Sequence, residues 1–166
     1  PYGHEPVDMP PDGPISVAFN LDIVGGVVGS LCEAYRETTR YDKTGHHVNL
    51  LFDHETPHIS VESPYTHPVL RITPRSPGPL FVRIPPWVDM DALKIDEATG
   101  PPRMTNGYLL FPKLATNRPL TLKFPLTEQH ITLKHPTRDI KARLRGDQVI
   151  AMENFGTDLT FFDPMD

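Results

Sequence analysis

The chain has 166 residues, a length that suits one domain with a small appendage and not two full domains. Its 16 Lys and Arg residues against 21 Asp and Glu residues give a formal net charge of −5, so the basic surface of a nucleic-acid-binding protein is missing. The longest apolar run, residues 23–32, is much shorter than the about 20 residues of a membrane-spanning helix, so we expect no membrane partner.

Proline is the most unusual part of the composition. The sequence contains 20 prolines, more than twice the average usage of about 5%. Because proline lacks a donor N–H and clashes inside helices, such a chain is either disordered or built from short strands joined by turns. The hydrophobic content of 38% favours the strands. The sequence begins at Pro1 without an initiator Met, so we expect a piece of a longer protein.

The first 45 residues are predicted to form an extended arm and one helix. Residues 1–14 have no periodicity and five prolines, which is typical of an arm or surface loop. A helix is predicted over residues 23–41, with Asp22 as its N-cap. Its apolar stripe, expected to be buried, consists of Val24, Val27, Val28, Leu31 and Tyr35. Gly25, Gly26 and Gly29 lie inside this helix, which indicates that a partner helix or a ligand approaches closely.

From His46 onward the hydrophobic period is two, with proline or glycine about every ten residues. Short runs without helices between them predict a mostly β fold, a β-sandwich or jelly-roll of about nine short antiparallel strands preceded by one amphipathic helix. The expected strands are residues 46–52, 58–63, 69–73, 80–84, 92–95, 108–111, 120–124, 130–134 and 147–153.

Three local patterns carry little chemistry. The glycines after Asp22 do not match the dinucleotide fingerprint, so helix packing is favoured over nucleotide binding. His46 and His47 are adjacent and would point to opposite faces of a strand, while His54 and His58 flank a proline turn without a third ligand. We therefore predict no metal and no cofactor. Cys32, beside the apolar stripe, is expected to be buried and inert.

Two further features concern the later strands. Arg145-Gly146-Asp147 matches a tripeptide that adhesion receptors bind, but a turn before the next strand explains it. Trp87 is the only tryptophan and follows two prolines that fix the chain direction at a strand end. A role as an anchor of the core is favoured over a role as a sugar-stacking platform.

The order of these motifs resembles the region that follows the catalytic barrel in the β-L-arabinofuranosidase-like glycoside hydrolases of family 127 and its relatives. The matching strings are LFVRIPPW at residues 80–87, NGY at 106–108, KFPL at 123–126 and RG at 145–146. Residues 22–30 resemble the start of the family's last barrel helix, and VNLL at residues 48–51 resembles the strand that follows it.

The resemblance implies a division of the chain. Residues 1–45 would be the arm and helix at the end of an upstream (α/α)6 barrel, and residues 46–166 would be a β-sandwich domain. Where the family has a nucleophilic and a zinc-binding cysteine, this sequence has Ile23 and Val24, which can do neither. The remaining catalytic residues would precede Pro1, so no catalytic residue is assigned to this chain.

Two functions follow as expectations. The first is a C-terminal accessory sandwich of a glycoside-hydrolase-like protein acting on carbohydrate, with the upstream barrel as its partner and the chemistry on the barrel. The second is a stand-alone carbohydrate-binding or protein-interaction sandwich without catalysis. A binding module needs aromatic side chains on its surface, and the candidates are Trp87, Tyr65 and Tyr108.

Overall fold

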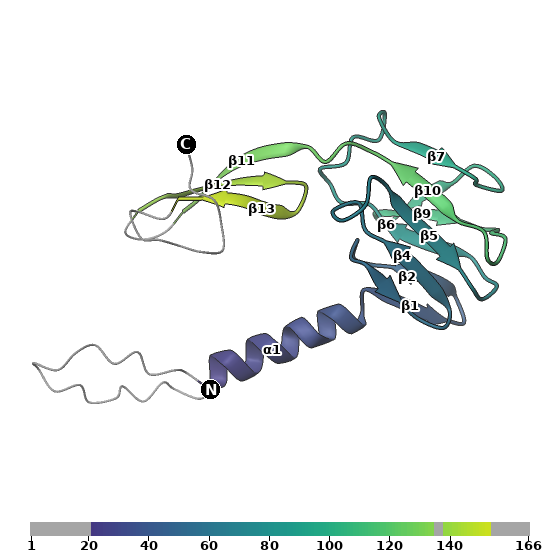
Figure 1. Cartoon of the computed structure of the whole chain (residues 1–166), viewed down its shortest axis with the longest axis horizontal. Coiled ribbons are helices and arrows are strands. Elements are labelled where there is room, and N and C mark those ends of the chain that lie inside the picture. The colour runs from purple at the N-terminus through teal and green to yellow at the C-terminus, as the bar shows by residue number, and fades with distance from the viewer. Residues whose placement is uncertain (1–20, 135–137, 154–166) are drawn as a thin grey trace, which may run out of the picture. The chain divides into compact units, whose positions relative to one another are not determined.

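A computed structural model describes residues 21–134 and 138–153, and the expected arm at residues 1–14 lies outside them. The chain divides into two compact units, Pro1–Glu37 and Thr38–Asp166. Within the described residues the first unit contains one helix, and the second contains thirteen strands in three sheets (Figure 1). The prediction of a mostly β, sandwich-like fold preceded by a helix is confirmed.

The helix, α1 (Leu21–Arg36), is shorter than predicted. It begins before Asp22, which is therefore inside the helix and not its N-cap. It also ends before Thr38 and Thr39, β-branched residues that favour a strand. The next residues form β1 (Thr39–Asp42), which pairs with β2 (Gly45–Val48) as a hairpin. The predicted helix end at Tyr41 was wrong because Tyr41 lies in β1, which the turn between Asp42 and Gly45 pairs with β2.

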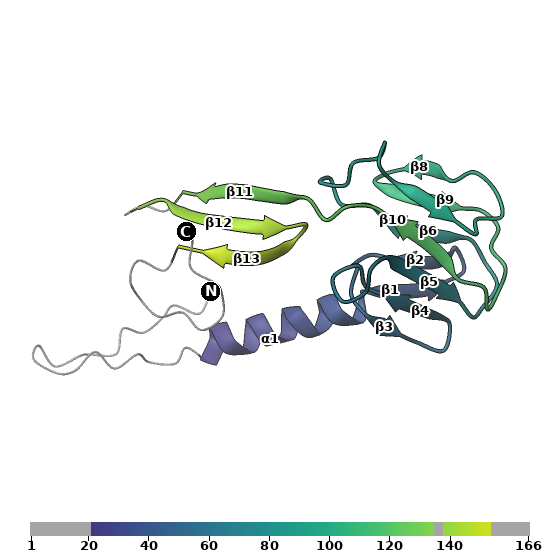
Figure 2. The ribbon, with the colours of Figure 1, turned by 45° about the horizontal axis from the view of Figure 1, so that its top comes forward.

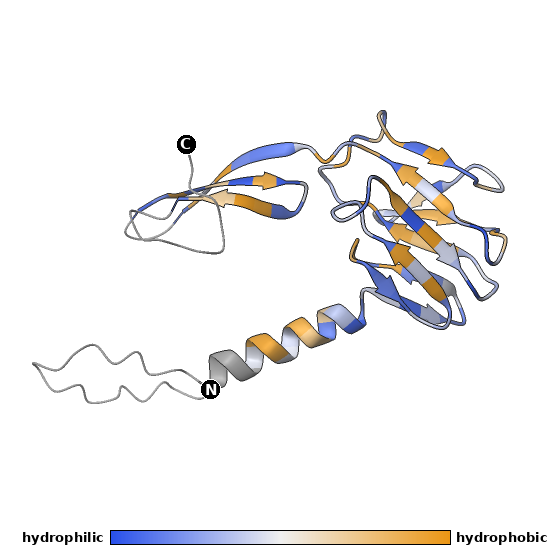
Figure 3. Cartoon of the chain, in the orientation of Figure 1, coloured by the Kyte–Doolittle hydropathy of each residue, from blue (hydrophilic) through white to orange (hydrophobic). Residues whose placement is uncertain are grey.

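The described apolar side chains of α1 are exposed in this chain, contrary to the expected burial. Val27, Val28, Leu31 and Tyr35 are between 51% and 64% exposed. Among the described residues, no atom beyond the helix's own backbone and the adjacent residues lies within 4 Å of a Cβ built on Gly26 or Gly29, so the expected close approach is not seen there. Figure 3 shows the hydrophobic bands along the helix.

Two five-stranded sheets form the sandwich (Figure 2). The first has the order β1-β2-β6-β9-β8, with β6 (Leu80–Arg83), β8 (Arg103–Thr105) and β9 (Tyr108–Phe111). The second has the order β3-β4-β5-β10-β7, with β3 (His54–Glu55), β4 (Ile59–Glu62), β5 (Leu70–Pro74), β7 (Lys94–Asp96) and β10 (Leu120–Lys123).

The core lies between these two sheets. Alternate residues of each strand face inward, as the period of two requires. The first sheet contributes Val48, Leu80, Val82, Leu109 and Phe111, and the second contributes Ile59, Val61, Leu70, Ile72, Leu120 and Leu122. All of these side chains are at most 3% exposed, so the sandwich has a closed apolar interior.

One pairing differs from the antiparallel expectation. β2 pairs with β6 in parallel, with His46 opposite Leu80 and Val48 opposite Val82. The strands between them in sequence, β3, β4 and β5, belong to the other sheet. Parallel neighbours need a crossover connection, and these three strands provide it.

The third sheet is a three-stranded meander of β11 (Glu128–Leu133), β12 (Ile140–Arg145) and β13 (Gln148–Met152). β12 was not among the predicted strands, and neither were β1, β3 and β8. Over the described part of the chain, no helix has the length and apolar character needed to cross a membrane.

Candidate functional site

Four residues connect the third sheet to the sandwich. They are here called the aromatic joint and are Tyr65, Trp87, Gly146 and Asp147. The Trp87 Nε1–H donates to Asp147 Oδ1 over 2.7 Å, and the Asp147 backbone N–H donates to the Tyr65 hydroxyl over 2.8 Å. The Gly146 backbone N–H donates to the Thr127 carbonyl over 2.8 Å. These bonds fix the turn between β12 and β13 against residues that are far away in sequence.

Trp87 is half-buried and packs against the core of the sandwich. Its ring centroid lies 5.9 Å from that of Phe124, and its one polar atom is satisfied by Asp147. These contacts fit the predicted anchor. The Arg145-Gly146-Asp147 tripeptide forms the β12–β13 turn as expected, and its aspartate carboxylate bonds to Trp87.

Three of the four motifs quoted above, at residues 80–87, 123–126 and 145–146, pack together at this tryptophan. The Ile84 N–H donates to the Gly107 carbonyl over 2.9 Å, which links the first motif to the second. Phe124 of the third motif packs on Trp87, and a Cβ on Gly146 of the fourth would lie 2.9 Å from Trp87 Cζ2. Phe124 and Gly146 are therefore packing residues of the aromatic joint.

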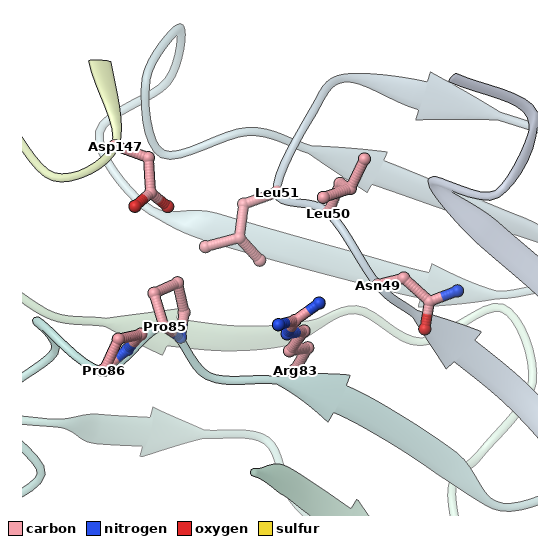
Figure 4. A pocket seen from close by; sticks show the side chains of 7 residues that line it. All are labelled: Asn49, Leu50, Leu51, Arg83, Pro85, Pro86 and Asp147. Carbon is pink, nitrogen blue, oxygen red and sulfur yellow. The ribbon is translucent and has the colours of Figure 1, made fainter. Parts of the chain in front are cut away.

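A hollow of about 220 Å³ opens beside the aromatic joint (Figure 4). Its walls come from three places in the chain: the loop after β2, the end of β6 with the two prolines that follow, and the β12–β13 turn. The residues that line it are Asn49, Leu50, Leu51, Arg83, Pro85, Pro86 and Asp147. Leu51 is 6% exposed and provides an apolar wall.

Opposite charges line this hollow. Figure 4 shows the Arg83 guanidinium and the Asp147 carboxylate extending toward the same open space from different elements. Among the described residues, no hydrogen bond or ion pair engages the Arg83 side chain. Asn49 lies at the opposite end from Asp147, and its Oδ1 accepts from the Tyr108 hydroxyl over 2.9 Å.

A sugar-stacking platform needs an exposed ring, and none of the three aromatic candidates from the sequence analysis has one. Trp87, Tyr65 and Tyr108 are all half-buried, and the polar atom of each is engaged by Asp147 or Asn49. Burial raises the pKa of the Tyr65 hydroxyl, so it stays protonated.

A second hollow, of about 350 Å³, also includes Asp147 in its lining. There the exposed aromatic residue is Phe52, which is 50% exposed and which the sequence analysis did not single out. Leu50, Leu51 and Phe52 form a continuous apolar run, so the sequence contains no local signal that Phe52 is the exposed member.

His46 and His47 are neighbours on β2 but make different contacts. The His46 ring centroid lies 4.5 Å from that of Tyr41, which also stacks on His58. The His47 ring stacks instead on Phe81, at 4.7 Å. His54 lies on β3, and His58 Nδ1 contacts the Ser76 hydroxyl. Within residues 21–134 and 138–153, no three His, Cys, Asp or Glu side chains are grouped so as to hold a metal ion.

His46 is the one fully buried histidine of the described residues. Its Nε2–H donates to the Ser76 carbonyl over 2.8 Å, and its Nδ1 has no partner. Desolvation lowers the pKa of the ring below its ordinary value, and so does nearby His58. Burial likewise lowers the pKa of His47, with Arg40 acting in the same direction.

We expect the sandwich to lose stability as the pH falls below about 6.5, the ordinary histidine pKa. The unfolded chain then takes up protons that the buried rings do not accept, and unfolding is favoured. Urea midpoints measured near pH 7.5 and pH 5.5 test this, in a range above the titration of ordinary carboxylates.

The variant His46→Gln should show a smaller difference between the two midpoints than the natural protein, whatever its midpoint at neutral pH. His130, exposed on β11, supplies the control His130→Gln, which should keep the natural difference. Equal midpoints at both pH values in the natural protein would contradict the expectation.

Cys32 is exposed, so its expected burial was wrong for this chain. The apolar stripe beside it is exposed as well, so Cys32 has the same exposure to solvent as the helix residues around it. The side chains of Ile23 and Val24 lie outside those that the structure describes.

Comparison with known proteins adds no relative: no family model matches the chain, and neither a curated protein nor a solved structure matches it.

Proposed function

We propose that this chain is the C-terminal accessory β-sandwich of a glycoside-hydrolase-like protein that acts on carbohydrate, with the chemistry on barrel residues outside the chain. The observation that carries the proposal is that three of the four family-like motifs, at residues 80–87, 123–126 and 145–146, pack together at the aromatic joint, while the NGY motif is hydrogen-bonded to the first of them through Ile84. Motifs far apart in sequence that pack on one another are under a common structural requirement. That requirement supports a shared architecture better than a set of unrelated short matches.

The helix supports the same proposal. In α1, Val27, Val28, Leu31 and Tyr35 present an apolar stripe of the kind that surface helices bury against a core. Leaving side chains of this size in water forgoes about 1.5–3 kcal/mol each. The proposed partner for the stripe is the upstream (α/α)6 barrel of the same parent protein, in which α1 is the last helix.

The reactivity of Cys32 tests this proposal, because it is one turn after Val28 on the exposed helix. The isolated chain should react with a maleimide at the rate of an accessible thiol. In the full-length product of the natural gene, the barrel should cover the stripe and slow the reaction at least tenfold.

Both proteins should react at the same rate after denaturation, which serves as the control. Equal rates in the folded isolated chain and in the folded gene product would contradict the proposal. So would a reading frame that encodes no helical domain before Pro1.

A stand-alone carbohydrate-binding sandwich is the second candidate, and the hollow between Arg83 and Asp147 favours it. A protein-interaction sandwich remains the other form of this alternative. The two candidates differ in what the helix requires: an accessory sandwich needs a partner for α1, whereas a stand-alone module must be soluble and monomeric with the stripe exposed. The Cys32 measurement separates them.

A further inference from the structure

We infer that the hollow lined by Asn49, Leu51, Arg83, Pro85 and Asp147 is a binding site for a single neutral sugar residue with adjacent hydroxyl groups. The inference rests on the proposed function for its carbohydrate class, and it adds a site that is separate from the barrel. It follows from the charges around the hollow, the way they are held and the size of the space.

The charges suit a neutral polyol. Arg83 has N–H donors that engage no described residue, and Asp147 has one carboxylate oxygen, Oδ2, beyond the one that accepts from Trp87. A pair of adjacent hydroxyls can accept from the guanidinium and donate to the carboxylate at the same time. A sugar acid would gain from Arg83, but its carboxylate would be repelled by Asp147 in a chain of net charge −5.

Half-buried aromatic residues hold two of the polar groups, Asp147 and Asn49, in place. Trp87 and Tyr65 each bond to Asp147, one at its side chain and one at its backbone. Tyr108 bonds to the Asn49 side chain, and the Asn49 N–H donates to the Thr38 carbonyl over 2.9 Å. Groups fixed before binding lose little conformational freedom when a ligand arrives, which favours affinity. The aromatic residues therefore position the site and do not serve as platforms.

The volume of the hollow limits the size of the ligand. A volume of about 220 Å³ is below the roughly 300–1,000 Å³ of pockets for drug-sized ligands. It accommodates one sugar residue, with Leu51, Pro85 and Pro86 as apolar walls for the C–H groups of the ring.

Nuclear magnetic resonance titration of the isotope-labelled chain tests the inference. The probes are methyl galactopyranoside, methyl xylopyranoside, methyl arabinofuranoside and sodium galacturonate. At least one neutral probe should shift the backbone signals of Asn49, Leu51 and Asp147 and the Nε–H signal of Arg83. A single-site curve with a Kd on the order of 1 mM is expected for so small a ligand.

Variants then assign the contacts. Arg83→Gln should weaken binding of the neutral probe at least tenfold. The control Arg103→Gln removes the same charge from an exposed position on β8 of the same sheet and should change the Kd less than twofold. Tyr108→Phe keeps the ring but removes the hydroxyl that holds Asn49. It should weaken binding severalfold without lowering the melting temperature.

Three results would overturn the inference: no probe binds, galacturonate binds and the neutral probes do not, or the shifts gather around Phe52 and leave Arg83 unchanged. Equal affinity of Arg83→Gln and the natural chain would do the same. None of these results bears on the accessory role, because the Cys32 measurement reports the partner of α1 and involves no saccharide.

Discussion

Replacing Trp87 with alanine should lower the free energy of unfolding of the sandwich by about 3 kcal/mol, the lower end of the range for large aromatic residues because the ring is half-buried. The variant loses the contacts with the core and with Phe124, and it leaves the Asp147 carboxylate without its donor. Such a loss is a large part of the about 5–15 kcal/mol that stabilises a domain. Thermal and urea unfolding of the full chain measure it.

Two variants separate the parts of this effect. Phe52→Ala removes an aromatic ring that is 50% exposed and should leave the melting temperature nearly unchanged. Trp87→Phe keeps a ring against the core but removes the bond to Asp147, so it should cost less than Trp87→Ala. An unshifted melting temperature in Trp87→Ala together with lost saccharide binding would show that this tryptophan is a platform after all.

The variant Gly146→Ala should lower the free energy of unfolding by about 2–5 kcal/mol, from two sources. The residue has a φ of +61°, a left-handed conformation that costs a non-glycine residue about 1–2 kcal/mol. The new Cβ would also lie 2.7 Å from the Tyr65 hydroxyl and 2.9 Å from Trp87 Cζ2. Such overpacking typically costs a further 1–3 kcal/mol or so. Urea unfolding gives the sum.

Gly107→Ala is the matched control for the second source. Gly107 also has a left-handed conformation, with a φ of +76°, but a Cβ built on it has no atom within 4 Å. This variant should therefore show only the conformational cost, and Gly146→Ala should be clearly less stable. If both variants lose the same stability, the turn does not pack tightly on Trp87 and Tyr65.

The strands were largely predictable because each sheet of the sandwich has one face toward solvent and one face toward the apolar core. Strand β9 was predicted with its observed bounds, Tyr108–Phe111, since it is a short apolar and aromatic run that follows a turn at Asn106-Gly107. β12 alternates apolar and basic residues in Ile140-Lys141-Ala142-Arg143-Leu144-Arg145, a strand signal that was interpreted only as the approach to a turn. β8 has three exposed residues and therefore no pattern to detect.

The helix shows that a local sequence pattern predicts secondary structure but not burial. The apolar spacing correctly predicts α1, since the period of a helix is local. Whether the stripe is buried depends on what lies next to it, and the described residues of this chain leave it exposed. The expected burial of Cys32 failed for the same reason.

The hollow could be predicted only in part. Two prolines before Trp87 indicated a fixed direction for the indole, and the ring does pack against the core. Its partner Asp147 was not predictable, since the two residues are brought together by the third sheet and share no sequence pattern. No local pattern marks Arg83 as a site residue, because its place beside Asp147 depends on the same tertiary contact.

The parallel pairing of β2 with β6 has a consequence for how the chain folds during synthesis. The β1–β2 hairpin is made before the other strands of its sheet, and the edge of β2 that pairs with β6 has no partner until β3, β4 and β5 have been made and β6 follows. Closing so long a loop costs entropy before any contact is gained, so this step slows folding. An open strand edge also invites pairing with other chains. Between the synthesis of His46 and that of Leu80, the unpaired edge of β2 is therefore open to pairing with another chain.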